Sequence, residues 1–215
     1  MAIELAVPGA KATGQSVKRL VDIFGAAVCL VLAAPVFAIV GLSLAVTTGG
    51  KVIFRQARLG KDGKIFAMLK FYTMRPMSDA DFKHFLDRNP LQKQEYARYQ
   101  KLAHDPRLTR LGRFLRQTSL DELPQLWNVL RGEMSLIGPR PILPEQAQMY
   151  GRPLELYIRA RPGMTGLWQV SGRNCLSWRE RVDCDRAYLA RWSIRTDISI
   201  LLRTPWVVLH RKGAY

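Results

Sequence analysis

The chain has 215 residues, enough for one compact domain with a short additional module. It carries 33 Lys and Arg against 17 Asp and Glu, a formal net charge of +16. With 48% hydrophobic and 23% charged residues, the composition excludes a disordered tail, a collagen-like repeat and an acidic binding protein. The positive charge predicts an anionic partner, and charge alone leaves nucleic acid, anionic lipid and phosphorylated substrates open.

Cysteine and histidine are too few and too scattered for two common kinds of site. The chain has three of each, none with C-x-x-C or metal-pair spacing. This pattern argues against a disulfide framework and against a zinc site. We therefore expect any chemistry to depend on carboxylates, hydroxyls and basic groups.

An uncharged segment from Ile23 to Gly50 exceeds the about 20 residues that cross the hydrocarbon core, so it predicts membrane association. Pro35 lies inside it and should bend or break the helix. Basic residues flank both sides: Lys11, Lys18 and Arg19 before, and Lys51, Arg55, Arg58, Lys61 and Lys64 after. Because positive residues prefer the cytoplasmic side, both ends are expected there. A re-entrant hairpin broken at Pro35 satisfies both flanks, and a kinked span is the open alternative.

The segment before residue 51 is expected to be a membrane module (residues 1–50), and residues 51–215 a cytoplasmic catalytic domain. Lys18 and Arg19 are expected to anchor the helix at lipid headgroups. Residues 51–54 and 64–69 predict short strands around a glycine turn.

The remaining predicted elements are mostly helical. Residues 79–102 are charged and helical in tendency, with an interruption at Asn89-Pro90, and residues 108–115 have apolar side chains at helical spacing. Residues 188–210, divided by Pro205, mix apolar, aromatic and basic residues, which suits the lipid interface as well as a protein core. The predicted fold is a helix-rich mixed α/β structure with one re-entrant membrane helix, amphipathic interface helices and a small β element.

Adjacent acids at Asp121 and Glu122 form the densest candidate site. Ser119-x-x-Glu122 is typical of a capping box, and Ser119→Ala would then cost on the order of 1 kcal/mol. However, Arg116 precedes the acids and Gly138-Pro139-Arg140-Pro141 follows them. Carboxylates that hold magnesium, together with arginine forks, are the groups that handle phosphate.

Ordered motifs along the chain resemble a known family. They are Lys18-Arg19-x-x-Asp22, Lys70-Phe71-Tyr72-Thr73-Met74, residues 118–130, residues 134–141, residues 161–166, Gln169, Gly172-Arg173-Asn174 and Asp197. From about Lys18 to His210 the chain resembles the bacterial sugar transferases, monotopic polyprenyl-phosphate phosphoglycosyl transferases. Its size is closest to stand-alone members that initiate exopolysaccharide synthesis by hexose-1-phosphate transfer.

The resemblance implies a reaction. Asp121 would attack the β-phosphate of a UDP-sugar, release UMP and hold a phosphosugar that undecaprenyl phosphate then accepts. Glu122 would be its catalytic partner. Mg²⁺ would bind at Asp121. The implied phosphate- or substrate-binding residues are Lys70, Arg116, Arg140, Arg173 and Asp197. The implied location is the cytoplasmic face of the bacterial inner membrane.

Two positions depart from the family pattern. Ala34 stands where members often have Ser before the helix-breaking Pro35, and Tyr72 stands where they often have a basic residue. The sequence names neither the sugar nor the oligomeric state, and a homodimer is one alternative.

The sequence leaves two other functions open. A non-enzymatic basic protein at the membrane surface would explain the charge, but the chain has no nucleic-acid-binding module. A magnesium-dependent lipid-phosphate phosphatase would use the same carboxylates and would release inorganic phosphate instead of UMP.

Overall fold

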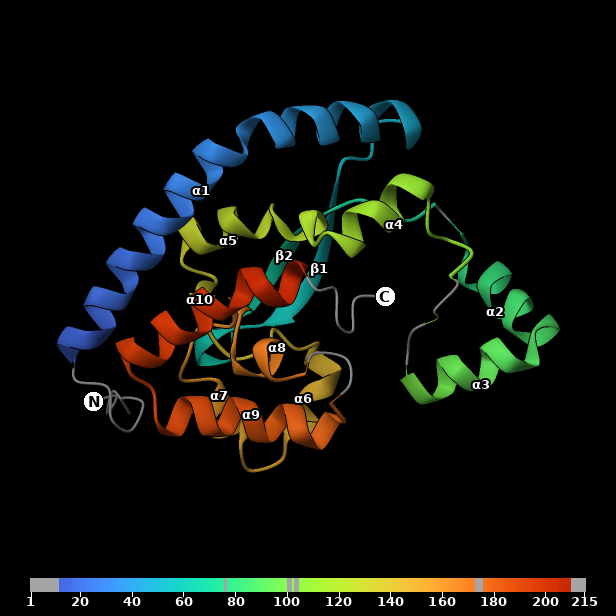
Figure 1. Ribbon diagram of the computed structural model, residues 1–215. Helices are drawn as coiled ribbons and strands as arrows, with labels where there is room; N and C mark the ends of the chain where they lie inside the picture. The colour runs from blue at the N-terminus through green and yellow to red at the C-terminus, as the bar shows by residue number, and fades with distance from the viewer. Residues whose placement is uncertain (1–11, 76, 100–101, 103–104, 173–175, 210–215) are drawn as a thin grey trace.

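The uncharged segment lies within one long helix, α1 (Ala12–Thr47), in the computed structural model of the chain (Figure 1). The structure describes residues 12–75, 77–99, 102, 105–172 and 176–209. Among these, α1 is the one helix long and apolar enough to cross a membrane. Many of its large apolar side chains are exposed, Phe24 at 74% and Leu32 at 73%. Such a continuous exposed apolar face fits membrane association.

The other elements are shorter. The helices are α2 (Asp79–Arg88), α3 (Pro90–Tyr99), α4 (Arg110–Gln117), α5 (Gln125–Arg131), α6 (Ala147–Tyr150), α7 (Leu154–Tyr157), α8 (Leu167–Ser171), α9 (Trp178–Ala190) and α10 (Ile194–Leu209). Three 3-10 turns are η1 (Lys61–Gly63), η2 (Leu120–Glu122) and η3 (Pro144–Gln146). The strands are β1 (Ile53–Leu59), β2 (Ile65–Phe71), β3 (Ser135–Ile137) and β4 (Gly163–Thr165). The prediction of a helix-rich mixed α/β fold is confirmed.

Pro35 does not interrupt α1. The helix continues through this residue, and Figure 1 shows a bent helix. Proline removes one backbone hydrogen bond and crowds the preceding turn, which bends a helix when residues on both sides stay helical. Val36 and Phe37, directly after the proline, pack against a buried cluster that includes Phe71 and Leu115. This packing favours a continuous helix, so the predicted break takes the form of a bend.

The start of α1 docks on the protein. Nζ of Lys18 lies 2.7 Å from Oδ2 of Asp197. Arg19 donates to the carbonyl oxygens of Val129 at 2.7 Å and Leu130 at 2.9 Å. These carbonyls belong to the last turn of α5, where a cation complements the helix dipole. In this structure both basic side chains therefore bind protein groups, in contrast to the expected contact with lipid headgroups.

The end of α1 docks on the same body. Val40 and Leu44 are buried and cluster with Phe71 of β2 and Leu115 of α4. Both ends of the helix are thereby held by the part of the chain that follows residue 51.

β1 and β2 form an antiparallel hairpin with Ile53 opposite Phe71 and Leu59 opposite Ile65. The two predicted strands are confirmed, and each extends further than the sequence pattern indicated. A second, parallel pair joins β3 and β4 and was not predicted. A Cβ atom on Gly163 would lie 2.1 Å from the amide nitrogen of Gly138, so only glycine permits this close approach.

The predicted interruption at Asn89-Pro90 is confirmed, since α2 ends at Arg88 and α3 begins at Pro90. By contrast, α10 continues through Pro205, where a division was expected. Ile200 of α10 is buried while Leu202 and Trp206 are exposed, which fits an amphipathic helix.

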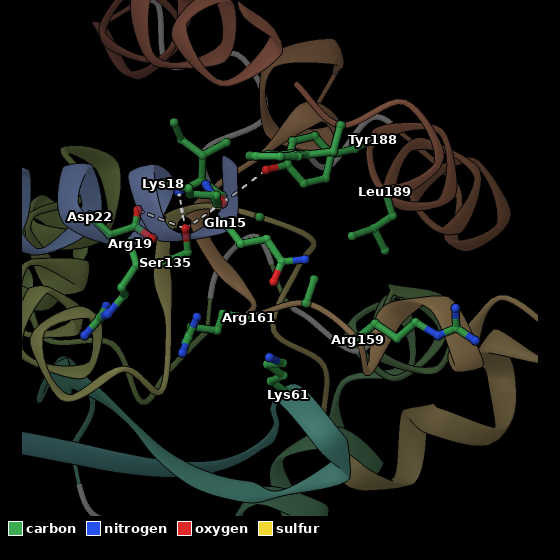
Figure 2. A pocket seen from close by; sticks show the side chains of 14 residues that line it. Gln15, Lys18, Arg19, Asp22, Lys61, Ser135, Arg159, Arg161, Tyr188 and Leu189 are labelled. Carbon is green, nitrogen blue, oxygen red and sulfur yellow. Dashed lines mark hydrogen bonds between the residues drawn. The ribbon is translucent and has the colours of Figure 1, made fainter. Parts of the chain in front are cut away.

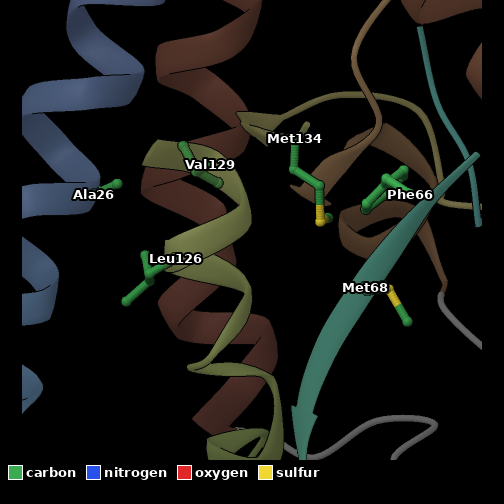
Figure 3. Close-up of a cluster of buried hydrophobic side chains, with 6 residues drawn as sticks. All are labelled: Ala26, Phe66, Met68, Leu126, Val129 and Met134. Carbon is green, nitrogen blue, oxygen red and sulfur yellow. The ribbon is translucent and has the colours of Figure 1, made fainter. Parts of the chain in front are cut away.

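One core cluster ties the membrane helix to the rest of the fold (Figure 3). Its buried members are Ala26 of α1, Phe66 and Met68 of β2, Leu126 and Val129 of α5, and Met134. The cluster holds β2, which carries Lys70, against α5, which follows the acid pair.

Candidate functional site

The acid pair lies on η2, a 3-10 turn between α4 and α5 that packs against β2. The predicted capping box is wrong. Ser119 has a left-handed backbone (φ 58°, ψ 14°), and its side chain makes no cap hydrogen bond. A capping hydroxyl needs an extended backbone at its own residue. The α-helix begins later, at Gln125 after Pro124, so Asp121 and Glu122 lie in the turn that precedes it.

Lys70, near the end of β2, lies close to both carboxylates. Its Nζ is 2.7 Å from Oε1 of Glu122 and 3.8 Å from Oδ2 of Asp121. The Asp121 side chain is 9% exposed, whereas the Glu122 side chain is 39% exposed. A buried acid and a more accessible acid thus share one ammonium group.

Burial raises the pKa of Asp121 to about 6. The positive charges of Lys70 and, to a smaller extent, Arg116 oppose this rise in the pKa, whereas the negative charge of Glu122 adds to it. At neutral pH Asp121 is therefore mostly ionised, in a site that solvates its charge poorly. A poorly solvated carboxylate beside cations is suited to act as a nucleophile.

Arg116, at the end of α4, is held beside the acids. Its Nε donates to Oγ1 of Thr73 at 3.0 Å. Burial lowers the pKa of Arg116, and the charge of Asp121 is the largest influence that opposes this change. The guanidinium stays charged at any pH of interest.

Arg140 follows β3 and is fixed through its backbone. Its amide donates to the carboxylate of Asp185, 3.2 Å from Oδ2, and its carbonyl accepts from the Tyr157 hydroxyl at 2.9 Å. The guanidinium carbon lies 4.6 Å from the ring centroid of Trp168. Burial lowers the pKa of Arg140, and Glu122 is the largest charge that opposes this. The structure therefore places Arg140 within the electrostatic reach of Glu122.

Asp185 and Tyr150 support this position and were missed in the sequence. The Tyr150 hydroxyl donates to Oδ2 of Asp185 at 2.6 Å, and Asp185 is 1% exposed. Burial raises the pKa of Asp185 to about 7. Asp185 lies in a helix with several other charged residues, so no pattern distinguished it; only the fold brings it to Arg140.

One predicted residue lies elsewhere. Asp197 is buried where α1, α9 and α10 meet, with hydrogen bonds from Lys18, Tyr188 at 2.8 Å and Trp192 at 3.1 Å. The fold therefore does not bring Asp197 into the hydrogen-bond network of the acid pair. Arg173 lies outside the described residues.

The acid pair fits a magnesium ion by its donor chemistry. No group of three His, Cys, Asp or Glu side chains suited to a metal occurs among the residues that the structure describes. Magnesium is usually held by one or two carboxylates together with substrate phosphates and water, so such a group is not required. Asp121 and Glu122 supply hard oxygen donors and already attract one cation, the Lys70 ammonium.

A separate pocket lies where α1 begins, bordered by α9 and by the turn between β1 and β2 (Figure 2). Lys18, Arg19, Lys61, Arg159 and Arg161 line it, and neither residue of the acid pair does. Arg19 and Arg161 also bind carbonyl oxygens at the end of α5. These two arginines thus have a structural role that accounts for part of the basic lining.

Comparison with known proteins shows similarity along the chain. Residues 13–211 match the family model described as bacterial sugar transferase. The chain is 45% identical over 206 residues to the UDP-galactose-lipid carrier transferase of Erwinia amylovora, covering 96% of this chain and 43% of that protein. It is 44% identical over 207 residues to the undecaprenyl-phosphate galactose phosphotransferase of Salmonella typhimurium, and the match covers 96% of this chain and 43% of that protein. It is 41% identical over 202 residues to the exopolysaccharide production protein ExoY of Rhizobium meliloti, with 94% and 89% covered. The chain thus spans less than half the length of the first two relatives and most of the length of ExoY.

Proposed function

The chain belongs to the bacterial sugar transferase family, and we propose that it transfers a sugar 1-phosphate from a UDP-sugar to undecaprenyl phosphate, as the first step of exopolysaccharide or glycoconjugate synthesis. The observation that carries this proposal is the grouping of two carboxylates with Lys70, Arg116 and Arg140. The names of the relatives in Erwinia amylovora and Salmonella typhimurium support galactose as the first sugar to test.

In the first step, an oxygen of Asp121 attacks the β-phosphorus of the UDP-sugar. The bond between this phosphorus and the bridging oxygen breaks, and the electron pair leaves with UMP. The low exposure of Asp121 keeps water from competing with the carboxylate. Lys70, Arg116 and Arg140 lower the repulsion between the carboxylate and the phosphate oxygens.

In the second step, a phosphate oxygen of undecaprenyl phosphate attacks the same phosphorus and releases Asp121. The product is undecaprenyl diphosphate-linked sugar. Glu122, more exposed than Asp121, positions Lys70 through their 2.7 Å ion pair. Bound Mg²⁺, held by Asp121 with substrate phosphates, would neutralise phosphate charge.

The acceptor is a lipid, so the site must lie next to a membrane. We propose that α1 enters the cytoplasmic leaflet of the bacterial inner membrane and returns to the same side. In support, Lys18 near one end of α1 and Leu44 near the other both contact the same body. A helix that crossed the bilayer would separate these ends by about 30 Å of hydrocarbon.

Cysteine labelling tests this topology. In a variant without native cysteines, Val17→Cys and Lys51→Cys place thiols at exposed positions on the two sides of the apolar segment. In spheroplasts, both should react with a membrane-impermeant maleimide only after permeabilisation. Reaction of either one in intact spheroplasts would rule out the re-entrant path.

UMP release tests the activity. Purified protein with Mg²⁺, undecaprenyl phosphate and a panel of UDP-sugars should release UMP with at least one sugar. Asp121→Asn should lower the rate by about 10³-fold or more, because it removes the nucleophile. Asp183→Asn, at an exposed carboxylate in α9, is the matched control and should keep the wild-type rate. Inorganic phosphate in place of UMP would identify a phosphatase instead.

The covalent step has its own test. Without acceptor, intact-mass spectrometry should show one phosphosugar on the wild-type protein and none on Asp121→Asn. UMP release that always requires acceptor, with no such adduct, would point to direct transfer between the two substrates.

A further inference from the structure

Arg58 of β1 is a basic residue that no motif singled out, and the Glu122 carboxylate is near enough to influence its pKa. Its guanidinium donates to the carbonyl oxygen of Pro141 at 3.1 Å and to Oε1 of Gln56 at 2.6 Å. The neighbouring backbone is tied to the same loop, because the amide of Leu59 donates to the carbonyl of Ile142 at 2.9 Å. Arg58 is thus fixed against the segment that directly follows Arg140.

Both arginines have an unused buried donor. Nε of Arg58 and Nε of Arg140 are buried and have no hydrogen-bond partner among the residues that the structure describes. An unsatisfied buried donor costs about 1–3 kcal/mol, and more when the group is charged. Two such donors on adjacent segments are available to an acceptor from outside the chain.

The charges around these donors favour an anion. Burial, together with the neighbouring charge of Arg140, lowers the pKa of Arg58 to about 10. The nearby Glu122 carboxylate acts in the opposite direction on both arginines. Glu122 also forms an ion pair with Lys70. Glu145 acts in the same direction on the pKa of Arg58, and Asp185 on the pKa of Arg140, so the feature that favours an anion is the repulsion of Arg58 by the neighbouring charge of Arg140.

We propose that Arg58 and Arg140 form a two-arginine clamp for the diphosphate group of the nucleotide-sugar donor. This inference rests on the proposed function and adds Arg58 as a substrate-binding residue. A guanidinium is planar and donates two parallel hydrogen bonds to phosphate oxygens, so two guanidiniums can engage two linked phosphates.

The clamp is preorganised on both sides. The Arg140 backbone is held by Asp185 and Tyr157, and its guanidinium lies over Trp168. The Arg58 guanidinium is held by Pro141 and Gln56. Groups fixed before binding lose little conformational entropy when the substrate arrives, which favours both affinity and orientation.

Pyrophosphate binding tests the clamp without depending on catalysis. The experiment compares wild-type full-length protein with Arg58→Gln, Arg58→Lys and Arg55→Gln, by isothermal titration with pyrophosphate at constant Mg²⁺. Arg55 is the matched control because it lies on the same strand and is exposed. Arg58→Gln should weaken pyrophosphate binding at least about tenfold, since it removes charge-assisted hydrogen bonds. The pyrophosphate affinity of Arg58→Lys should lie between those of wild type and Arg58→Gln, and the affinity of Arg55→Gln should equal that of wild type.

The activity assay then separates failure of the clamp from failure of the proposed function. If wild type releases UMP, Arg58→Gln should raise KM for the UDP-sugar, and an unchanged KM with unchanged pyrophosphate affinity would overturn the clamp. If wild type releases no UMP, the proposed function fails, and pyrophosphate affinity alone decides about the clamp.

A purely structural role for Arg58 gives a different result. Arg58→Gln would then lower the melting temperature without changing pyrophosphate affinity, and this outcome would also overturn the clamp. If Arg58→Gln does not fold, the test depends on Arg58→Lys, and a pyrophosphate affinity equal to that of wild type in this variant would overturn the clamp. The clamp would also be overturned if the wild-type protein does not bind pyrophosphate.

Discussion

Lys18 and Asp197 form a 2.7 Å ion pair across 179 positions of the chain. The pair joins the start of α1 to α10, and both side chains are largely buried, 19% and 10% exposed. Tyr188 and Trp192 donate to the same carboxylate. With both oxygens of Asp197 engaged by protein donors, the arrangement favours docking of the membrane helix as the role of this acid.

Loss of this ion pair should destabilise the fold. Lys18→Met leaves a buried carboxylate without its cation, so the free energy of unfolding should fall by roughly 3 kcal/mol. Urea unfolding in detergent measures this difference. Lys93→Met is the control, because it removes an ion pair of the same 2.7 Å length with Asp87 on the surface. An exposed pair contributes far less to stability than a buried one, because water already solvates both charges. Equal costs for the two variants would contradict the docking role.

Replacement of Ser119 by glycine should stabilise the fold. Its φ of 58° is costly for a side chain, and the side chain makes no cap hydrogen bond. Ser119→Gly should therefore raise the free energy of unfolding by about 0.5–1 kcal/mol. Ser119→Ala should be nearly neutral, whereas a capping serine would lose on the order of 1 kcal/mol. Chemical denaturation of both variants measures these free energies of unfolding. A destabilised Ser119→Ala variant would indicate that Ser119 caps a helix in solution.

Asp121 should titrate near pH 6 in protein stripped of divalent cations. Because its pKa is raised, the nucleophilic carboxylate is lost as the pH falls through about 6. Lys70→Met removes a nearby cation and should raise this pKa, and Glu122→Gln removes a nearby anion and should lower it. Carboxyl ¹³C NMR measures the titration, with Asp121→Asn to assign the resonance. An ordinary aspartate titration near pH 4 would show that burial does not control the ionisation of this carboxylate. Added Mg²⁺ should lower the midpoint, since a cation favours the ionised form.

Sequence patterns were informative where the deciding interactions are local. The hairpin strands, the interruption at Asn89-Pro90 and the long apolar helix follow from alternation, proline and hydrophobic length. The prediction of a capping box was wrong because the same Ser-x-x-Glu spacing also occurs in this turn, where Ser119 has a left-handed backbone. Motifs led to Lys70, Arg116 and Arg140, which the fold gathers around Glu122 and Asp121.

Long-range contacts limited the remaining predictions. Arg58 and Asp185 have no distinguishing neighbours in sequence, and their contacts with the Arg140 loop span 83 and 45 positions. Pro35 was expected to bend or break its helix and Pro205 to divide a stretch, yet both helices are continuous. The packing on both sides of each proline was not visible in the sequence.

Asp185 should make the stability of the fold depend on pH. Its pKa is about 7 in the fold, well above the ordinary aspartate value, because burial disfavours the charged form. The folded state therefore prefers the protonated acid. The contribution of Asp185 to the free energy of unfolding is complete below the pKa that this group has in the unfolded chain, and it is lost as the pH rises through about 7. Between pH 5.5 and 8.5 the free energy of unfolding should fall by about 2 kcal/mol from this group alone.

The comparison with Asp185→Asn isolates this contribution, because asparagine does not ionise. The difference in unfolding free energy between wild type and Asp185→Asn should change by about 2 kcal/mol across this pH range. Asp183→Asn, two positions away on the same helix and exposed, should retain the wild-type pH dependence. If Asp185→Asn and wild type show parallel pH profiles, Asp185 is ionised in the fold throughout. Its contacts with Tyr150 and the Arg140 amide would then stabilise the charged form more strongly than burial opposes it.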